Sequence, residues 1–151
     1  FSGPLHLVLA NHQLWVEDAT DGAVVRVDPL RNRRTGAILQ SGPACGGMTA
    51  DGDSVWVASG CDESTVTRID AKTARVVRLI ELPGVAFDVA AGVGAVWATT
   101  TNGLLVRIDP KTNRIVATRS LGDAVSLTTG NRSVWVVNRV TRSVLRLGPA
   151  D

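Results

Sequence analysis

The sequence predicts an all-β fold, a β-propeller of about four blades, and three observations lead to this prediction. The tryptophans recur at nearly regular spacing, as Trp15, Trp56, Trp97 and Trp135. About eleven residues after each of them comes a second repeated block that begins Arg-x-Asp or Arg-x-Gly. Both blocks alternate apolar and polar residues and are rich in β-branched side chains, which is typical of half-buried strands. Repeats of about 40 residues that hold four short antiparallel strands are typical of propeller blades.

The first two strands of each repeat are placed by the tryptophan. The first strand precedes it and ends in a turn rich in Gly, Asn and Asp, which are turn-forming residues. The second strand carries the tryptophan, whose side chain is expected to fill the space between neighbouring blades. The first strands are predicted at residues 5–9, 46–50, 87–91 and 125–129.

The third strand of each repeat carries the arginine block, as in Arg26-Val27-Asp28-Pro29. The Asp and Pro at its end predict a turn, because Asp bonds nearby backbone amides and Pro presets φ at the next position. The recurring arginines are interpreted as structural, stacking on the blade or pairing along it; they are Arg26, Arg68, Arg107 and Arg146. Fourth strands are predicted at 36–40, 75–81 and 114–120.

The fourth repeat stops at Asp151 and has no fourth strand, so fifteen strands are expected. The chain is interpreted as one domain, residues 1–151, with repeats at about 4–42, 43–83, 84–122 and 123–149. An open arc of blades exposes an apolar face at each end, which must be covered. We therefore expect self-association that completes a ring, ahead of a closed ring of four blades or a piece of a longer chain.

Composition excludes several protein classes. With 44% apolar and 20% charged residues, the chain has an ordinary globular composition. A net charge of +2 argues against a dedicated nucleic-acid binder, and no apolar run is long enough to span a membrane. The start at Phe1 lacks the features of a signal peptide, so any targeting segment is expected to be absent or already removed. The preference for Arg over Lys indicates a bacterial source.

The two repeated blocks also resemble a known family. The pattern Gly-x-Val-Trp-Val followed by Val-x-Arg-Ile-Asp-Pro-x-Thr is similar to the YVTN-type repeats of bacterial propellers, which are related to streptogramin lyase-like and NHL-type proteins. The resemblance covers residues 5–149. It implies a propeller but not an activity, because this fold hosts many functions.

The two cysteines, Cys45 and Cys61, are predicted to lie opposite one another across the first hairpin of the second repeat. Cross-strand neighbours are close enough for a disulfide after small adjustments. Two buried free thiols are the alternative, and the spacing of the Cys and His residues matches no zinc motif. A disulfide would indicate a secreted or extracytoplasmic protein.

Candidate ligand-binding residues lie in the loops that enter the first strand and leave the second strand of each repeat, since these loops open on one face of a propeller. The position nine residues before each tryptophan is polar, and it includes His6 and Asp88. These two residues with nearby carboxylates are a candidate cation or ligand site, and a solvated channel mouth is the alternative. The candidate ligand-binding residues are His6, Glu17, Asp62, Asp88, Asn102, Asn138 and Arg139.

The resemblance to lyases implies a metal-bound substrate and a histidine base on this face. Here His6 alone can serve as that base, because His12 falls in a turn at the other end of its strand. No catalytic residue, cofactor or identified metal is predicted. The chain is interpreted as a non-enzyme, and a metal-assisted lyase of the streptogramin lyase type is the alternative.

The opposite rim collects basic residues in the turns between third and fourth strands: Arg31, Arg33, Arg34, Lys72, Arg75, Lys111 and Arg114. This rim is a second candidate site, for phosphates or another anionic surface. Stacking on single-stranded nucleic acid is poorly supported, because no exposed aromatic residues lie among the charges. The leading hypothesis is an extracytoplasmic module that binds a protein, a peptide or a small ligand.

Overall fold

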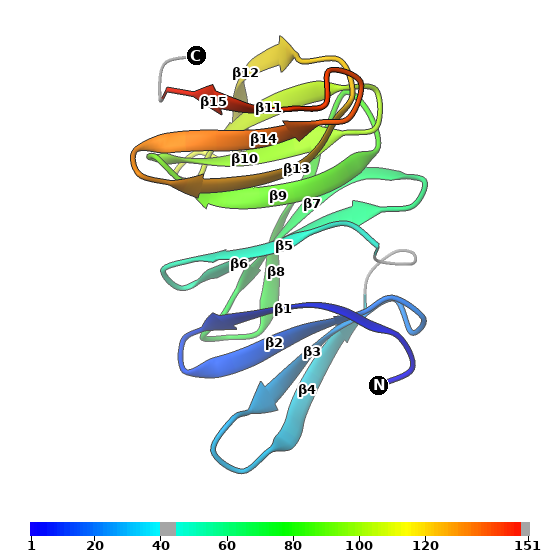
Figure 1. Cartoon of the computed structure of the whole chain (residues 1–151). Helices are drawn as coiled ribbons and strands as arrows, with labels where there is room; N and C mark the ends of the chain where they lie inside the picture. The colour runs from blue at the N-terminus through cyan, green and yellow to red at the C-terminus, as the bar shows by residue number, and fades with distance from the viewer. Residues whose placement is uncertain (40–44, 149–151) are drawn as a thin grey trace.

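A computed structural model describes residues 1–39 and 45–148 of the chain. Its fifteen strands form four antiparallel sheets, three of four strands and one of three, in chain order (Figure 1). This confirms the predicted all-β fold, a partial propeller of about four blades. We number the sheets as blades 1 to 4. Gln40 and Pro149, which the sequence placed in a strand and in the last repeated block, lie outside the described residues.

Within each blade the strands pair with their neighbours in sequence, from an inner first strand to an outer last strand. Blade 1 holds β1 (Pro4–Ala10), β2 (Gln13–Asp18), β3 (Ala23–Asp28) and β4 (Arg33–Leu39). Blade 2 holds β5 (Met48–Asp51), β6 (Ser54–Gly60), β7 (Glu63–Asp70) and β8 (Arg75–Glu81). Blade 3 holds β9 (Ala86–Gly92), β10 (Ala95–Thr100), β11 (Leu104–Asp109) and β12 (Arg114–Ser120). Blade 4 holds β13 (Ala124–Gly130), β14 (Ser133–Asn138) and β15 (Ser143–Leu147).

Two predicted strand boundaries are wrong. β4 begins three residues earlier than the predicted 36, and β5 begins at Met48 rather than at residue 46. At Gly46 a Cβ atom would lie 2.4 Å from the carbonyl oxygen of Ala58, so the backbone passes too close to β6 for a side chain there. The segment before Met48 is therefore packed against β6 without extending the regular ladder.

The blades are stacked in chain order. β1 packs on β5, β5 on β9 and β9 on β13, and blades 1 and 4 lie at opposite ends of the arc (Figure 1). An apolar cluster fills each space between successive blades. Trp15 packs there against blade 2, Trp56 against blade 3 and Trp97 against blade 4. Their side chains are 0%, 0% and 1% exposed, as expected for wedges between sheets.

Polar contacts of the repeated residues fix the blades internally. The indole N–H groups of Trp15, Trp97 and Trp135 each donate to the carbonyl five residues earlier. Opposite the tryptophans, the guanidinium groups of Arg68, Arg107 and Arg146 lie over the indole rings at 4.9 to 5.4 Å. This agrees with the structural interpretation of these arginines.

The predicted Asp turns are present in blades 1 to 3. Asp28 accepts hydrogen bonds from the backbone amides of Leu30 and Arg31, and Asp70 from those of Lys72 and Thr73. Asp109 accepts one from the amide of Lys111. Each aspartate therefore closes the hairpin between a third and a fourth strand. No helix among the described residues is long and apolar enough to span a membrane.

The disulfide between Cys45 and Cys61 is present, with 5.6 Å between the Cα atoms. Its position differs slightly from the prediction. The β5–β6 register pairs Met48 with Val57, so the two cysteines lie just outside the ladder and not at a directly paired position. Cys61 has a positive φ of 52° and lies in the tight turn between β6 and β7.

Candidate functional site

Each blade has two ends. We call "loop face" the end at which the chain enters the first strands and turns from second to third strands. We call "turn face" the opposite end, which carries the hairpin turns between first and second and between third and fourth strands. The sequence placed the candidate ligand-binding residues on the loop face, where the strand bounds also put them.

On the loop face of blade 1, His6 and Glu17 form a pair. Nδ1 of His6 and Oε2 of Glu17 lie 2.6 Å apart and are joined by a hydrogen bond. The Glu17 side chain is fully buried, and its Oε1 has no hydrogen-bond partner among the described residues. Burial raises the pKa of Glu17, and the bond to His6 offsets only part of this effect. Glu17 thus fixes the imidazole of the half-exposed His6 through Nδ1, so that Nε2 is the ring atom that can meet a ligand.

Asp88 connects the inner strands of blades 3 and 4. Its Oδ2 accepts hydrogen bonds from the hydroxyl of Ser126 at 2.8 Å and from the amide of Leu127 at 2.9 Å. Its Oδ1 accepts one from its neighbour Val89, and the same atom lies against Gly47 of blade 2. Asp88 and His6 therefore bond to different partners. No group of three His, Cys, Asp or Glu side chains in the described chain is arranged to hold a metal ion.

Asn102 and Asn138 hold loops in place. Nδ2 of Asn102 donates to the carbonyl of Pro83, and Nδ2 of Asn138 donates to the carbonyl of Leu121. Each acceptor lies in the segment that leads into the first strand of the same blade. Such bonds satisfy carbonyls that no strand pairs, so these two amides have a structural role.

The remaining predicted residues differ in how freely they can reach a ligand. Arg139 makes a two-pronged ion pair with Asp123, with distances of 2.9 and 3.0 Å. This pair holds the pKa of the Asp123 carboxyl below its usual range. Asp62 is exposed in the turn that follows the disulfide. The loop face thus offers His6 and Asp62 to solvent and uses most of the other predicted residues internally.

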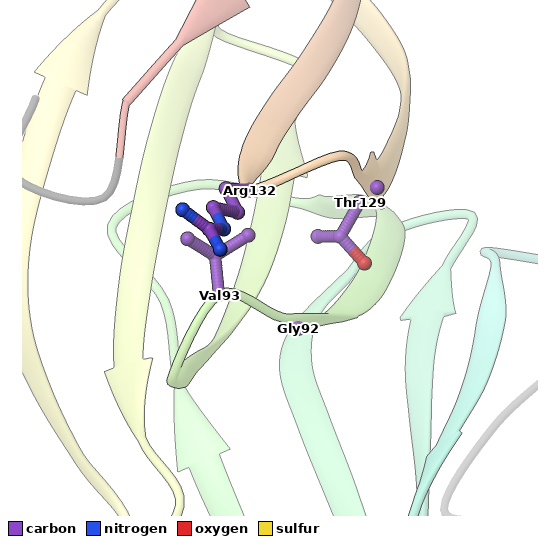
Figure 2. Close-up of a pocket in the computed structure, with 5 residues that line it drawn as sticks. Gly92, Val93, Thr129 and Arg132 are labelled. Carbon is purple, nitrogen blue, oxygen red and sulfur yellow. The ribbon is translucent and has the colours of Figure 1, made fainter.

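The turn face carries a pocket that sequence reasoning missed. It has a volume of about 550 Å³ and is lined by Gly92, Val93, Thr129, Gly130 and Arg132 (Figure 2). It is a largely open depression of the surface, and its volume is in the range of small-molecule sites. Gly92 and Gly130 end the inner strands of blades 3 and 4, so the pocket opens where these two strands meet the turn face.

The pocket lining contains one charged side chain, Arg132, and one hydroxyl group, that of Thr129. In the view of Figure 2 the Arg132 and Val93 side chains overlap and Thr129 lies apart from them, and all three line the pocket. The hydroxyl of Thr129 donates to the carbonyl of Ala91 at 2.6 Å, which leaves its oxygen able to accept. Arg132 is exposed and supplies the charge of the lining. The only signal in the sequence is the pair of glycines five residues before Trp97 and Trp135, and the repeat pattern explains these equally well as turn residues.

Charge is distributed unevenly between the two faces. The basic rim predicted from the sequence lies on the turn face together with Arg132, although Arg31 pairs with Asp28 and Lys72 with Asp53. The loop face and its strand ends carry mostly acidic residues: Glu17, Asp18, Asp21, Asp62, Glu63, Glu81, Asp88 and Asp123, against Arg119, Arg139 and Arg142. The turn face also carries five aspartates, and its basic residues outnumber them: Asp28, Asp51, Asp53, Asp70 and Asp109. The turn face therefore has an excess of basic side chains and the loop face an excess of acidic ones.

Solved structures with the same fold are similar to this chain. Myxococcus xanthus glutaminyl cyclase has a TM-score of 0.69 at 13% identity, over 99% of this chain and 67% of that chain. Kuenenia stuttgartiensis hydrazine synthase has a TM-score of 0.74 at 13% identity, over 97% of this chain and 50% of that chain. The computationally designed Ika4 protein has a TM-score of 0.80 at 15% identity, over 97% of this chain and 92% of that chain. These likenesses support the fold alone.

This chain therefore spans only about half the length of the hydrazine synthase chain. No curated protein matches the sequence. The profile of a repeat of unknown function, DUF6923, matches residues 19–139, with no specific assignment to the YVTN or NHL type. Because this match covers most of the chain, the chain belongs to the DUF6923 repeat family.

Proposed function

We propose that this propeller arc is an extracytoplasmic binding module, similar to the YVTN-type propellers, and that it holds a small anionic ligand in the pocket of the turn face. The observation that carries the proposal is the hollow of about 550 Å³ whose lining is small or apolar apart from Thr129 and Arg132. The disulfide between Cys45 and Cys61 supports the oxidising setting.

The lining favours a ligand with an apolar body and one carboxylate. Val93 and the two glycines offer apolar and backbone surface, and the guanidinium of Arg132 can bind a carboxylate through two parallel hydrogen bonds. The hydroxyl oxygen of Thr129 can accept a further hydrogen bond from the ligand. A phosphate monoester would satisfy the same arginine, and it is the second ligand class to test.

The experiment is a binding screen by NMR or calorimetry with small aliphatic and aromatic carboxylates, each compared with its uncharged amide. We expect carboxylates to bind and amides to bind at least about tenfold more weakly, because an ion pair with Arg is lost. Arg132→Asn should abolish the preference. Arg142→Asn is the matched control, because Arg142 is also an exposed turn residue with positive φ but lies on the loop face.

Two results would contradict the proposal. Equal binding of carboxylates and amides would show that Arg132 does not select ligands by their negative charge. Binding of an oligonucleotide that weakens steeply with salt and does not depend on Arg132 would instead favour the basic rim as the functional surface.

A further inference from the structure

The two end faces of the arc expose residues that are buried at every internal junction. Leu7 of β1 is 66% exposed, whereas the residues at the same position in the other inner strands, Met48, Val89 and Leu127, are at most 9% exposed. At the other end, Val144 of β15 is 63% exposed, whereas its counterpart in blade 3, Leu105, is 2% exposed. Leu105 and Leu127 belong to one cluster around Trp97. The faces of Leu7 and Val144 thus correspond to the two halves of a junction.

The junction between blades 2 and 3 adds polar contacts to this apolar packing. Arg68 lies over the Trp56 ring and is held from its own blade by the hydroxyl of Ser54. Its Nη1 donates across the junction to the carbonyl of Pro110 at 2.6 Å and to Oδ1 of Asn113 at 2.7 Å. Both acceptors belong to the Asp-Pro-x-x-Asn turn of blade 3.

The first and last blades carry between them the same donor and the same acceptors. On blade 4, Arg146 lies over the Trp135 ring and is held by the hydroxyl of Ser133 at 2.9 Å, as Arg68 is by Ser54. On blade 1, Pro29 and Asn32 occupy the places of Pro110 and Asn113 in an identical Asp-Pro-x-x-Asn turn, and Asn32 has the same left-handed backbone.

Within this chain the donor and its acceptors do not meet. Neither the carbonyl of Pro29 nor the side chain of Asn32 accepts a hydrogen bond in the described residues. The junction between blades 1 and 2 behaves differently, because its turn has Ala74 in place of the asparagine. There Arg26 bonds to Thr35 of its own blade. Of these two junctions, only the one with an asparagine in its turn has an arginine that is shown reaching across.

We propose that a second copy of this chain completes the ring head-to-tail, with blade 4 of each copy packed on blade 1 of the other. Trp135, Val137 and Val144 would then be covered by Leu5, Leu7 and Leu9, and Arg146 would donate to Pro29 and Asn32. The chain covers 50% of the hydrazine synthase chain and 45% of the designed Ika8 protein, so two arcs together have about the length of one such chain. A closed arrangement with two identical junctions leaves no face exposed.

The first measurement is the solution mass by light scattering across a dilution series. We expect a dimer with twice the 15.9 kDa of the chain. Leu7→Glu and Val144→Lys should each weaken the dimer at least about 100-fold, because each places an unpaired charge in an apolar junction. Val116→Glu, on the outer strand β12 with 54% exposure, is the matched control and should leave the dimer unchanged.

Mixing the two variants distinguishes head-to-tail pairing from pairing of like faces. In a mixed head-to-tail ring one junction is unchanged, and the other places the introduced glutamate near the introduced lysine. The mixture should therefore recover a dimer that neither variant forms alone. Pairing of two blade 1 faces or of two blade 4 faces allows no such recovery. A chain that stays monomeric at all concentrations, or a dimer that is insensitive to both variants, would overturn the proposal.

The polar contact has its own test in Asn32→Ala. Ala74 has the same left-handed backbone at the same place in blade 2, so alanine is accepted there. We expect this variant to fold normally and to raise the dissociation constant of the dimer about tenfold, because Arg146 loses a charge-assisted bond. An unchanged dissociation constant would exclude the assigned contact between Arg146 and Asn32.

Discussion

Blades 2 and 4 are built from the same repeat, yet their tryptophans have different environments. Trp56 is fully buried against blade 3, whereas Trp135 is only half-buried on the outer face of blade 4. Both make the same contact with an arginine of their own blade. The difference shows that a blade orients its tryptophan and that the next blade buries it. Stability should therefore depend on position along the arc more than on the repeat sequence.

The largest expected difference between the two blades is in the effect of Trp56→Ala and Trp135→Ala on stability. We expect Trp56→Ala to lower the free energy of unfolding by about 3–5 kcal/mol, because it empties a large wedge between two sheets. Trp135→Ala should cost about 1 kcal/mol in protein dilute enough to be monomeric. Chemical denaturation of both variants measures the difference. Equal losses would mean that the half-buried ring is as well packed as the buried one.

The disulfide is the next largest difference between the two blades, since blade 2 has one and blade 4 has none among its described residues. Replacing both cysteines by serine should cost about 3 kcal/mol, by the loop-closure estimate for about 15 residues. Denaturation with and without reductant measures the same quantity in the wild type. Two thiols that alkylate without reductant would show that the bond does not form.

Arg68→Ala tests the contacts that cross a junction. It should cost about 1.5–3 kcal/mol, because Arg68 makes charge-assisted hydrogen bonds to Pro110 and Asn113. In dilute protein Arg146→Ala should cost less than about 1 kcal/mol, because its bonds stay within one blade. Thermal or chemical unfolding of the two variants gives the comparison. A larger loss for Arg146→Ala would contradict it.

The smallest effect concerns the position two residues after the tryptophan, which is the buried Glu17 in blade 1 and the exposed Val137 in blade 4. Because burial raises the pKa of Glu17, the native state binds more protons than the unfolded state between the two pKa values. The contribution of Glu17 to stability should therefore fall as pH rises through that window. Unfolding of wild type and Glu17→Gln at several pH values should show that the wild type loses stability relative to the variant as pH rises. If the stability of the wild type instead rises with pH relative to Glu17→Gln, the direction inferred for the Glu17 pKa shift is wrong.

The fold was predictable because each repeat contains its own recognisable marker residues. Tryptophan spacing, arginine blocks and the Asp turns of blades 1 to 3 each mark one strand or hairpin through contacts made within a single blade. The disulfide was predictable for the same reason, since a hairpin brings its two ends together. The half-burial of Trp135 follows from its place in the last repeat.

The candidate site was less predictable, because it depends on contacts between repeats. Asn102 and Asn138 are polar residues in loops, and no sequence pattern distinguishes an amide that binds a ligand from one that bonds a carbonyl of its own blade. The pocket of Arg132 combines turn residues of blades 3 and 4 that lie almost 40 residues apart in the chain. Only the packing of two blades brings them together.

The uneven charge of the two faces has a physical consequence for the whole molecule. Opposite charges at the two ends of the strands give the protein an electric dipole along the propeller axis, although its net charge is only +2. Near an anionic surface the molecule should therefore turn its basic face toward that surface and its acidic loop face toward the solvent. The arc would adsorb in one preferred orientation, and that orientation would weaken as salt shortens the range of the field.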